Sequence, residues 1–265
     1  MNVNCVVFNV EKLELPKNLY PARWWHALEN NEVECFLCPR HCRLKNGKRG
    51  VCRVRTNIEG RLFSEVYGKP IAIHVDPIEK KPLYHFQPGS RIFSIGTAGC
   101  NLQCEFCQNW DISTADGHLG MGRIVQPAEI VQSAIDNQCG SIAFTYNEPT
   151  IFGEYVVDIA KLARQSNLKT VTVTNGYITQ EAIADIYPLI DAANIDLKSM
   201  NADFYRKRCH AELTPVLEAI VAIQKVGTFI ELTTLLIPGL NDSEGEIQKL
   251  CDWILDNLGN DTPLH

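Results

Sequence analysis

Three cysteines close together in the chain could hold an iron–sulfur cluster. Cys100, Cys104 and Cys107 follow the spacing C-x3-C-x2-C, and Phe106 stands directly before the last of them. Thiolates are the usual protein ligands of [4Fe-4S] clusters, and a set of three leaves the fourth iron without a protein ligand. An open position of this kind lets a second molecule bind the metal. We therefore expect a cluster with an open iron, rather than a zinc site or a chance spacing.

A cysteine loop with this spacing, and with an aromatic residue before the third cysteine, resembles the signature of the radical S-adenosylmethionine (SAM) superfamily. Residues 94–102 and 107–110 more closely resemble the radical SAM member of the AmmeMemoRadiSam system, which is itself similar to pyruvate formate-lyase activating enzymes. The likeness extends over nearly the whole chain, including residues 35–42 and 50–52. It implies an oxidoreductase that reductively cleaves SAM to a 5′-deoxyadenosyl radical and abstracts hydrogen from a substrate that the sequence does not indicate.

A second group of cysteines lies nearer the N-terminus. Cys35, Cys38, Cys42 and Cys52 have the spacing C-x2-C-x3-C-x9-C and are surrounded by arginines and lysines. Four thiolates make a closed tetrahedral site, which would stabilise a loop-rich module with little apolar core. Zinc and a second [4Fe-4S] cluster both suit these ligands, and uncoordinated thiols are the third interpretation. The remaining cysteines are single and are interpreted as small core or surface residues: Cys5, Cys139, Cys209 and Cys251.

Alternating apolar and amphipathic segments from residue 91 onward predict a parallel sheet covered by helices. The expected strands are Ile92–Ile95, Ser141–Thr145, Thr170–Thr174, Ala192–Ile195 and Phe229–Ile237. The expected helices are Ala128–Asn137, Phe152–Gln165, Gln180–Tyr187, Leu213–Lys225 and Ser243–Leu258. With the resemblance, this pattern predicts an α/β fold: a partial (β/α)6 TIM-like barrel over residues 91–265.

Residues 1–90 would form a separate N-terminal region that contains the cysteine-rich module at residues 35–62. A helix is expected at Pro21–Glu32 and an extended segment at Val66–Ile73. The final residues, Thr262–His265, have the pattern of another strand that is only beginning. We therefore expect the chain to be a truncated form of a longer protein.

Short polar motifs follow the expected strands, where parallel β/α proteins place their functional side chains. Glu148 lies where radical SAM proteins commonly carry a Gly-Gly-Glu-like segment that binds the SAM amino group; a helix-capping turn is the alternative. Asn175 could reach a ribose or a carboxylate, although Val173 replaces an aspartate that activating enzymes tend to have. Asp196 and Lys198 share one face of their strand, so they could bind SAM hydroxyls and the SAM carboxylate or form a structural ion pair.

The resemblance adds two further candidate contacts to SAM, His265 and Phe106, the latter near the adenine. It also implies a reductant such as flavodoxin or ferredoxin and suggests a Memo-type partner protein. A non-catalytic iron–sulfur electron carrier or scaffold is the alternative function, and a zinc-only binding module is a third.

The overall composition limits the partners and the location. A net charge of −6 and a pI near 5.7 argue against a general nucleic-acid or membrane binder. No apolar run reaches the roughly 18 residues of a membrane span, and the first residues do not form a secretory signal. Eleven cysteines without an export signal favour metal binding in the reducing cytoplasm.

Overall fold

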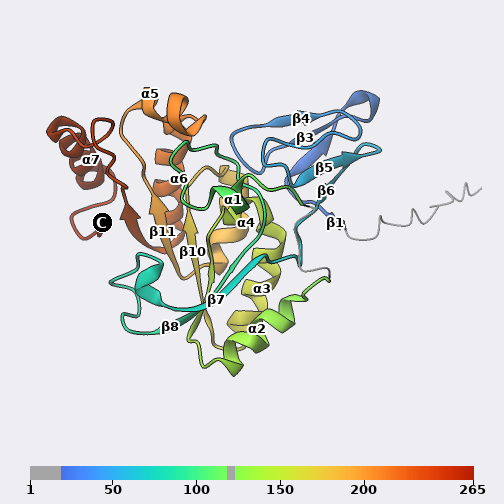
Figure 1. The fold of residues 1–265 in the computed structure, drawn as a ribbon, viewed down its shortest axis with the longest axis horizontal. Coiled ribbons are helices and arrows are strands. Elements are labelled where there is room, and N and C mark those ends of the chain that lie inside the picture. The colour runs from blue at the N-terminus through green and yellow to red at the C-terminus, as the bar shows by residue number, and fades with distance from the viewer. Residues whose placement is uncertain (1–18, 118–122) are drawn as a thin grey trace, which may run out of the picture.

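A six-stranded sheet forms the centre of the protein in the computed structural model, which describes residues 19–117 and 123–265 (Figure 1). Five strands run parallel and lie side by side in chain order: β8 (Arg91–Gly96), β9 (Ser141–Phe144), β10 (Lys169–Thr174), β11 (Ala192–Asp196) and β12 (Phe229–Thr233). Most of their residues are buried on both faces, as their apolar composition predicts. The expected parallel sheet is confirmed.

The outer face of the sheet is covered by the amphipathic helices that the sequence predicts. These are α2 (Pro127–Asp136), α3 (Gly153–Gln165), α4 (Gln180–Ile186), α6 (Leu213–Val226) and α7 (Glu244–Asn257). Local signals fix their ends: a capping box joins Gln126 and Glu129 at the start of α2, and Gly227 ends α6 with a φ of 98°. Shorter elements are α1 (Trp110–Ser113), α5 (Ala202–Phe204) and a π-helical turn at Tyr205–Cys209. Single 3-10 turns lie at Glu29–Asn31, Ile78–Lys80, Pro149–Phe152 and Tyr187–Leu189.

Two small antiparallel sheets form the region before the large sheet. One has the order β2-β3-β4 (Trp25–Ala27, Val33–Cys35, Cys42–Leu44), and the other has the order β1-β6-β5 (Tyr20–Pro21, Arg61–Ser64, Arg55–Ile58). The helix predicted over Pro21–Glu32 is therefore wrong. Trp24 instead takes a φ of 55°, is buried, and donates its indole N–H to Asp185 on α4 at 2.9 Å. This tertiary contact and the pairing of β2 with β3 outweigh the local helical spacing.

A buried ion pair attaches these small sheets to the helices around the large one. Arg55 on β5 donates both terminal guanidinium nitrogens to Glu154 on α3, at 3.0 and 2.9 Å, and it also binds the carbonyl of Arg23. Both side chains are almost completely buried. Burial of two charges is favourable only with such close pairing, so loss of either partner would leave an uncompensated charge in the interior.

Strand β7 (Ala72–Pro77) lies within the expected N-terminal region but belongs to the large sheet. It pairs antiparallel with β8 from Ala72–Gly96 to Pro77–Arg91, a few residues later than the extended segment predicted at Val66–Ile73. β7 thus forms one edge of the large sheet and leads the chain directly into its first parallel strand.

The last residues of the chain pair with β12 at the other edge of the sheet. Leu264 forms a parallel bridge with Leu232, and His265 donates its backbone N–H to the Leu232 carbonyl at 2.9 Å. β12 itself ends at Thr233, earlier than predicted, and Leu235 and Leu236 are exposed. In the two described stretches of chain, no helix has both the length and the apolar character to cross a membrane.

Candidate functional site

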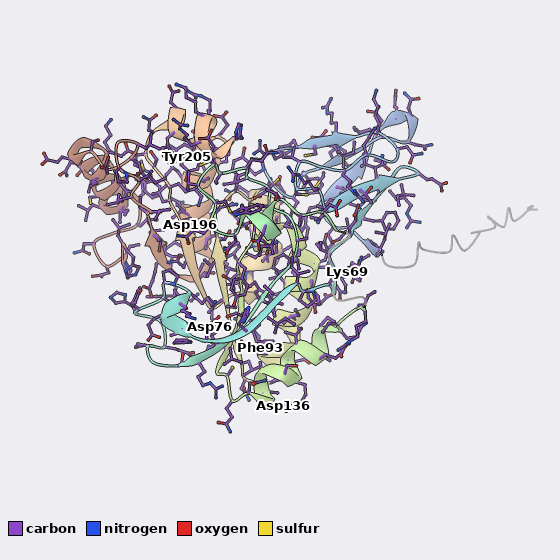
Figure 2. The ribbon with its side chains drawn as sticks, viewed as in Figure 1. Lys69, Asp76, Phe93, Asp136, Asp196 and Tyr205 are labelled. Carbon is purple, nitrogen blue, oxygen red and sulfur yellow. The ribbon has the colours of Figure 1, made fainter. Side chains whose placement is uncertain are left out.

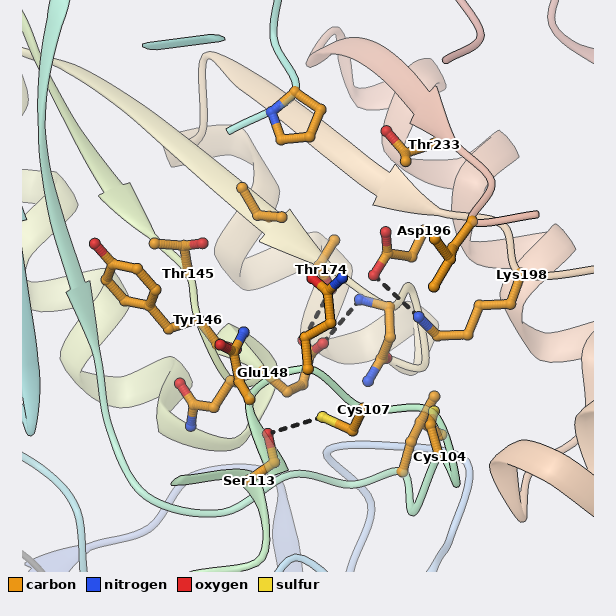
Figure 3. A pocket seen from close by; sticks show the side chains of 18 of the residues that line it. Cys104, Cys107, Ser113, Thr145, Tyr146, Glu148, Thr174, Asp196, Lys198 and Thr233 are labelled. Atoms are coloured by element: carbon orange, nitrogen blue, oxygen red, sulfur yellow. Dashed lines mark hydrogen bonds and ion pairs between the residues drawn. The ribbon is translucent and has the colours of Figure 1, made fainter. Parts of the chain in front are cut away.

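A pocket of about 490 Å³ opens at the carboxyl ends of the parallel strands (Figure 3). Figure 2 shows Asp196 and Tyr205 on this side of the molecule, with Asp136 at the opposite end. All nine predicted barrel site residues line the pocket: Cys100, Cys104, Phe106, Cys107, Glu148, Asn175, Asp196, Lys198 and His265. They come from segments that follow five different strands, which a parallel sheet brings to one edge.

The loop that carries the three cysteines is held tightly against its surroundings. Asn147 accepts the backbone N–H of Thr97 at 3.1 Å and donates to the carbonyl of Gly99 at 2.8 Å. Gly99 has a φ of 88°, and a side chain there would come within 2.5 Å of the carbonyl oxygen of Cys52. The position therefore requires glycine for both conformation and space. It also brings the N-terminal module into contact with the cysteine loop.

Hydrogen-bond donors surround the sulfur atoms of this loop. The backbone N–H of Leu102 lies 3.4 Å from Cys100 Sγ, and the side-chain amide of Asn175 lies 3.7 Å from the same sulfur. The Cys107 thiol donates to the hydroxyl oxygen of Ser113 at 3.6 Å, and that hydroxyl can donate to the sulfur once the thiol is deprotonated (Figure 3). Donors of this kind stabilise the negative charge on metal-bound sulfur. Three thiols on one pocket wall, with donors directed at them, fit an iron–sulfur cluster that has three protein ligands.

The pKa of Cys104 is lowered, which favours its thiolate form. Hydrogen bonding with Cys209 is the largest cause, and the nearby ammonium of Lys198 acts in the same direction against burial. Burial raises the pKa of Cys100 in the absence of a metal. A bound cation would compensate that charge, because metal binding requires the deprotonated thiol.

Glu148 is buried and already holds four protein donors. Its carboxylate accepts the N–H and hydroxyl of Thr150, at 2.9 and 2.6 Å, the hydroxyl of Thr174 at 2.8 Å and the N–H of Asn175 at 2.8 Å. Burial raises its pKa despite these bonds. The side chain thus caps the 3-10 turn Pro149–Phe152, as the alternative interpretation expected, and it joins the ends of β9 and β10.

Asn175 connects the cysteine loop to the end of β10. In addition to its contact with Cys100, its Nδ2 donates to Asn101 Oδ1 at 2.9 Å, and its Oδ1 accepts the N–H of Tyr177 at 2.8 Å. Asn101 is fully buried and donates to the Tyr177 carbonyl at 2.7 Å. The two asparagines therefore position the first cysteine.

Asp196 and Lys198 form an ion pair of 3.0 Å at the end of β11, on the pocket wall (Figure 3). Burial opposes the charge of Lys198, but the neighbouring Asp196 and Cys104 outweigh it and raise the lysine pKa, so it stays protonated. The ammonium also lies 5.9 Å from the centre of the Phe106 ring. The pocket thus presents a fixed positive charge, a carboxylate and an aromatic face close to the three thiols.

The four N-terminal cysteines also meet. Cys35 on β3 lies directly opposite Cys42 on β4 in the antiparallel register. One small pocket beside Asn101 is lined by Cys35, Cys38, Cys42 and Cys52. Burial raises the pKa of Cys52 to about 12 and that of Cys38 further. Thiolates at such positions require a cation for compensation, which suits a metal site. All ten cysteines in the described part of the chain are free.

The sequence did not predict several residues that lie in the site or next to it. Cys209, interpreted as a single core or surface cysteine, is fully buried against Cys104. Asp76 on β7 accepts the ammonium of Lys81 at 2.8 Å and the hydroxyl of Tyr146 at 2.9 Å, and the last two line the pocket. No local spacing marks the contacts of Asp76 with Tyr146 and of Cys104 with Cys209, because they join segments that are far apart in the sequence. Cys5 lies outside the described residues.

A parallel α/β sheet with a three-cysteine pocket at its carboxyl edge defines a class of SAM-dependent enzymes. The family model "Radical SAM superfamily" matches residues 94–253, more than half of the chain. The chain belongs to the radical SAM superfamily. Membership implies an iron–sulfur cluster and SAM as cofactors and supports SAM-dependent radical chemistry by an enzyme.

Individual relatives are consistent with this assignment. The chain is 43% identical over 244 residues to the uncharacterized protein MJ0808 of Methanocaldococcus jannaschii, covering 92% of this chain and 72% of that protein. It is 24% identical over 168 residues to the pyruvate formate-lyase-activating enzyme of Clostridium pasteurianum, covering 61% and 68%. It is 28% identical over 121 residues to the 4-hydroxyphenylacetate decarboxylase activating enzyme of Clostridium scatologenes, covering 44% and 38%. The likeness to activating enzymes expected from the sequence is confirmed.

Proposed function

We propose that the protein reductively cleaves SAM and abstracts a hydrogen atom from a substrate, as an activating enzyme does. The observation that carries the proposal is the set of three thiols, Cys100, Cys104 and Cys107, on the wall of a pocket that also contains the Asp196–Lys198 pair. Bound there, a [4Fe-4S] cluster and SAM would supply a 5′-deoxyadenosyl radical after one-electron reduction. The proposed architecture is a partial (β/α)6 barrel at residues 91–265.

Different pocket residues would bind different parts of SAM. Lys198 offers its ammonium to the SAM carboxylate, and Asp196 accepts hydrogen bonds from hydroxyl groups. Phe106 provides an apolar face for the adenine. His265 borders the same pocket. Asn175 acts through Cys100, whose sulfur it contacts.

Glu148 would contribute to SAM binding mainly by shaping the pocket wall, because its carboxylate is occupied by Thr150, Thr174 and Asn175. An ammonium group would have to share these oxygen atoms or bind the neighbouring backbone.

The N-terminal module, residues 35–62 within the region 1–90, would hold a second metal through Cys35, Cys38, Cys42 and Cys52. Zinc and a second [4Fe-4S] cluster remain the two alternatives. Either would stabilise the cysteine loop, since Arg40 of the module donates to the carbonyl of Asn101 at 3.1 Å.

The electron would come from a flavodoxin- or ferredoxin-like reductant in the cytoplasm, where thiols stay reduced. The likeness to activating enzymes supports a glycyl-radical enzyme as the target. The resemblance to the AmmeMemoRadiSam system supports a Memo-type partner instead, and the two are distinguished by which protein is modified.

The decisive experiment is anaerobic reconstitution with iron and sulfide, followed by addition of dithionite and SAM. We expect bound iron and release of 5′-deoxyadenosine, and we expect Cys104→Ser to abolish the release. Cys251→Ser, on α7 and outside the pocket, is the control and should keep the activity. If Cys104→Ser forms the nucleoside as fast as the parent, the proposal is wrong.

The metal content distinguishes the alternatives. Iron bound without nucleoside release would indicate an electron carrier or scaffold, and zinc without iron would indicate a zinc-binding module.

A further inference from the structure

Two histidines and a glutamate meet beside the pocket and form a group that contains no cysteine. His85 follows the 3-10 turn Ile78–Lys80, Glu231 lies on β12, and His265 is on the segment that pairs with β12. Glu231 Oε2 lies 2.6 Å from His265 Nε2 and 3.2 Å from His85 Nδ1, and the three ligand atoms all lie within 4.8 Å of one another. We propose that these three residues bind a divalent transition-metal ion such as zinc or cobalt.

The buried position of Glu231 favours a cation at this place. Its side chain is completely buried, and its hydrogen-bond partners are the backbone N–H groups of Tyr84, His85 and Phe86 and the two imidazoles. Among the described residues, its only ionisable partners are the two histidines; no lysine or arginine pairs with it. A buried charge is costly unless it is paired or coordinates a metal. A metal shared with two neutral histidines would supply the missing charge.

A similar group elsewhere in the chain shows what distinguishes this one. Glu34 also faces two histidines, His26 at 3.7 Å and His41 at 3.4 Å, but Arg43 pairs with it at 3.2 Å. Its charge is therefore already compensated by a permanent cation. Glu231 pairs with two histidines as Glu34 does, but no arginine among the described residues pairs with it.

The two separations between the Glu231 oxygen and the histidine nitrogens are close to those of a tetrahedral ion, and the two histidine nitrogens lie within 4.8 Å of each other. Nitrogen and oxygen ligands at about 2.0–2.2 Å from such an ion are separated from each other by about 3.3 Å. The separation of 3.2 Å to His85 fits directly, and the 2.6 Å to His265 requires only a small outward movement of the imidazole.

Backbone groups hold the carboxylate in position for this role. Glu231 Oε1 accepts the N–H of His85 at 2.8 Å and of Phe86 at 3.1 Å, and Oε2 accepts the N–H of Tyr84 at 3.0 Å. Metal-binding carboxylates are usually fixed by hydrogen bonds of this kind. The ring of Tyr84 also lies against the ring of His265, with centroids 4.9 Å apart, which restrains that ligand.

The three protein ligands leave at least one position of a tetrahedral ion open. Because His265 and Thr233 line the main pocket, water or an oxygen atom of a molecule in the pocket could complete the coordination. The site would thus contact whatever occupies the space beside the SAM-binding residues. The site does not depend on assembly of the cluster, since none of its ligands is a cysteine; His265 is the one ligand that is also a candidate SAM contact.

Anaerobic titration of the cluster-free full chain with Co²⁺ tests the proposal. Cobalt at the cysteine sites gives sulfur-to-metal charge-transfer absorption, whereas cobalt at a histidine–carboxylate site gives only d–d bands. In the parent we expect d–d absorption from the histidine–carboxylate site in addition to the charge-transfer absorption of cobalt bound at the cysteines, and in His85→Ala we expect the affinity of the component without charge transfer to fall at least about tenfold while the charge-transfer component is unchanged. His85 is 57% exposed, so its replacement should leave the fold intact, which thermal unfolding verifies.

His26→Ala is the matched control, because His26 is similarly exposed and also faces a glutamate. It should bind cobalt as the parent does. Equal titrations of the parent and His85→Ala would overturn the proposal and leave a simple hydrogen bond between His265 and Glu231. Failure of SAM cleavage would not affect this readout, so the two proposals can fail independently.

Discussion

The carboxylate of Glu148 accepts the backbone N–H of Asn175 at 2.8 Å. Both residues are predicted to contact SAM, and in the structure they are hydrogen-bonded to each other. The bond connects the segment after β9 to the end of β10, directly behind Cys100, whose sulfur the Asn175 side chain contacts. One buried carboxylate thereby connects the pocket wall at the end of β9 to the residue that contacts the first cysteine.

Replacement of Glu148 by glutamine should therefore destabilise the protein. A neutral amide offers one oxygen to four donors and turns its own N–H groups toward them, which leaves buried donors unsatisfied. We expect the free energy of unfolding to fall by about 1–3 kcal/mol, measured by denaturant titration. Glu218→Gln, on the exposed side of α6, should have little effect. Unchanged stability of Glu148→Gln would show that the four hydrogen bonds contribute nothing measurable.

The contact between Gly99 and Cys52 can be tested by comparing two glycines. Gly99→Ala adds a methyl group 2.5 Å from the Cys52 carbonyl at a φ of 88°, whereas Gly239→Ala has a φ of 76° and nothing within 4 Å. Conformational strain should cost both variants about 1 kcal/mol, so any additional loss in Gly99→Ala reports the clash. We expect Gly99→Ala alone to lose iron after reconstitution, measured by metal analysis. Equal iron content in the two variants would contradict this.

The sequence predicts much of this arrangement because its signals are local. The spacing of Cys100, Cys104 and Cys107 and the apolar runs of the parallel strands are properties of short segments, and the structure places them as expected. The helix predicted around Trp24 failed because a distant partner, Asp185, determines the conformation of that residue. Contacts between separated segments carry no local signal.

The same limit explains the missed site residues. The sequence alone indicates a single polar residue in a strand at Glu231 and a histidine in a loop at His85. Only the pairing of the last residues with β12 brings His265 beside them. Asp76 and Cys209 were missed for the same reason, since Tyr146 and Cys104 approach them from loops that are distant in the sequence.

Asp76 should make stability depend on pH in the acid range. Burial opposes its ionisation, but hydrogen bonds from Lys81 and Tyr146 outweigh burial and lower its pKa from 3.8 to about 2. A lowered carboxyl pKa stabilises the folded state above the ordinary value, and this stabilisation is lost as the pH falls toward the folded pKa. The shift corresponds to about 2 kcal/mol.

Asp76→Asn removes this contribution. The difference in unfolding free energy between parent and variant should shrink by about 2 kcal/mol from about pH 5 to about pH 2, measured by denaturant titration across that range. Asp136→Asn, exposed at the end of α2, serves as the control. A difference that stays constant with pH would mean that the Asp76 carboxylate is not stabilised by its neighbours.

Lys198 should determine how tightly SAM binds. Lys198→Met keeps the length of the side chain but removes the ammonium, and Asp196 is 38% exposed and can be solvated in its absence. We expect the affinity for SAM, measured by equilibrium binding to the reconstituted protein, to fall by about tenfold or more, because hydrogen bonds to charged groups contribute about 1.5–3 kcal/mol. The variant should retain its iron, since the three thiols are unchanged.

Lys169→Met is the matched control for this measurement. Lys169 forms a comparable ion pair, 2.8 Å to Asp191, but it lies at the start of β10, at the amino ends of the parallel strands and away from the pocket at their carboxyl ends. Its loss should leave SAM affinity unchanged. If Lys198→Met binds SAM as tightly as Lys169→Met does, the Asp196–Lys198 pair is purely structural, and the SAM carboxylate is bound by other groups of the pocket.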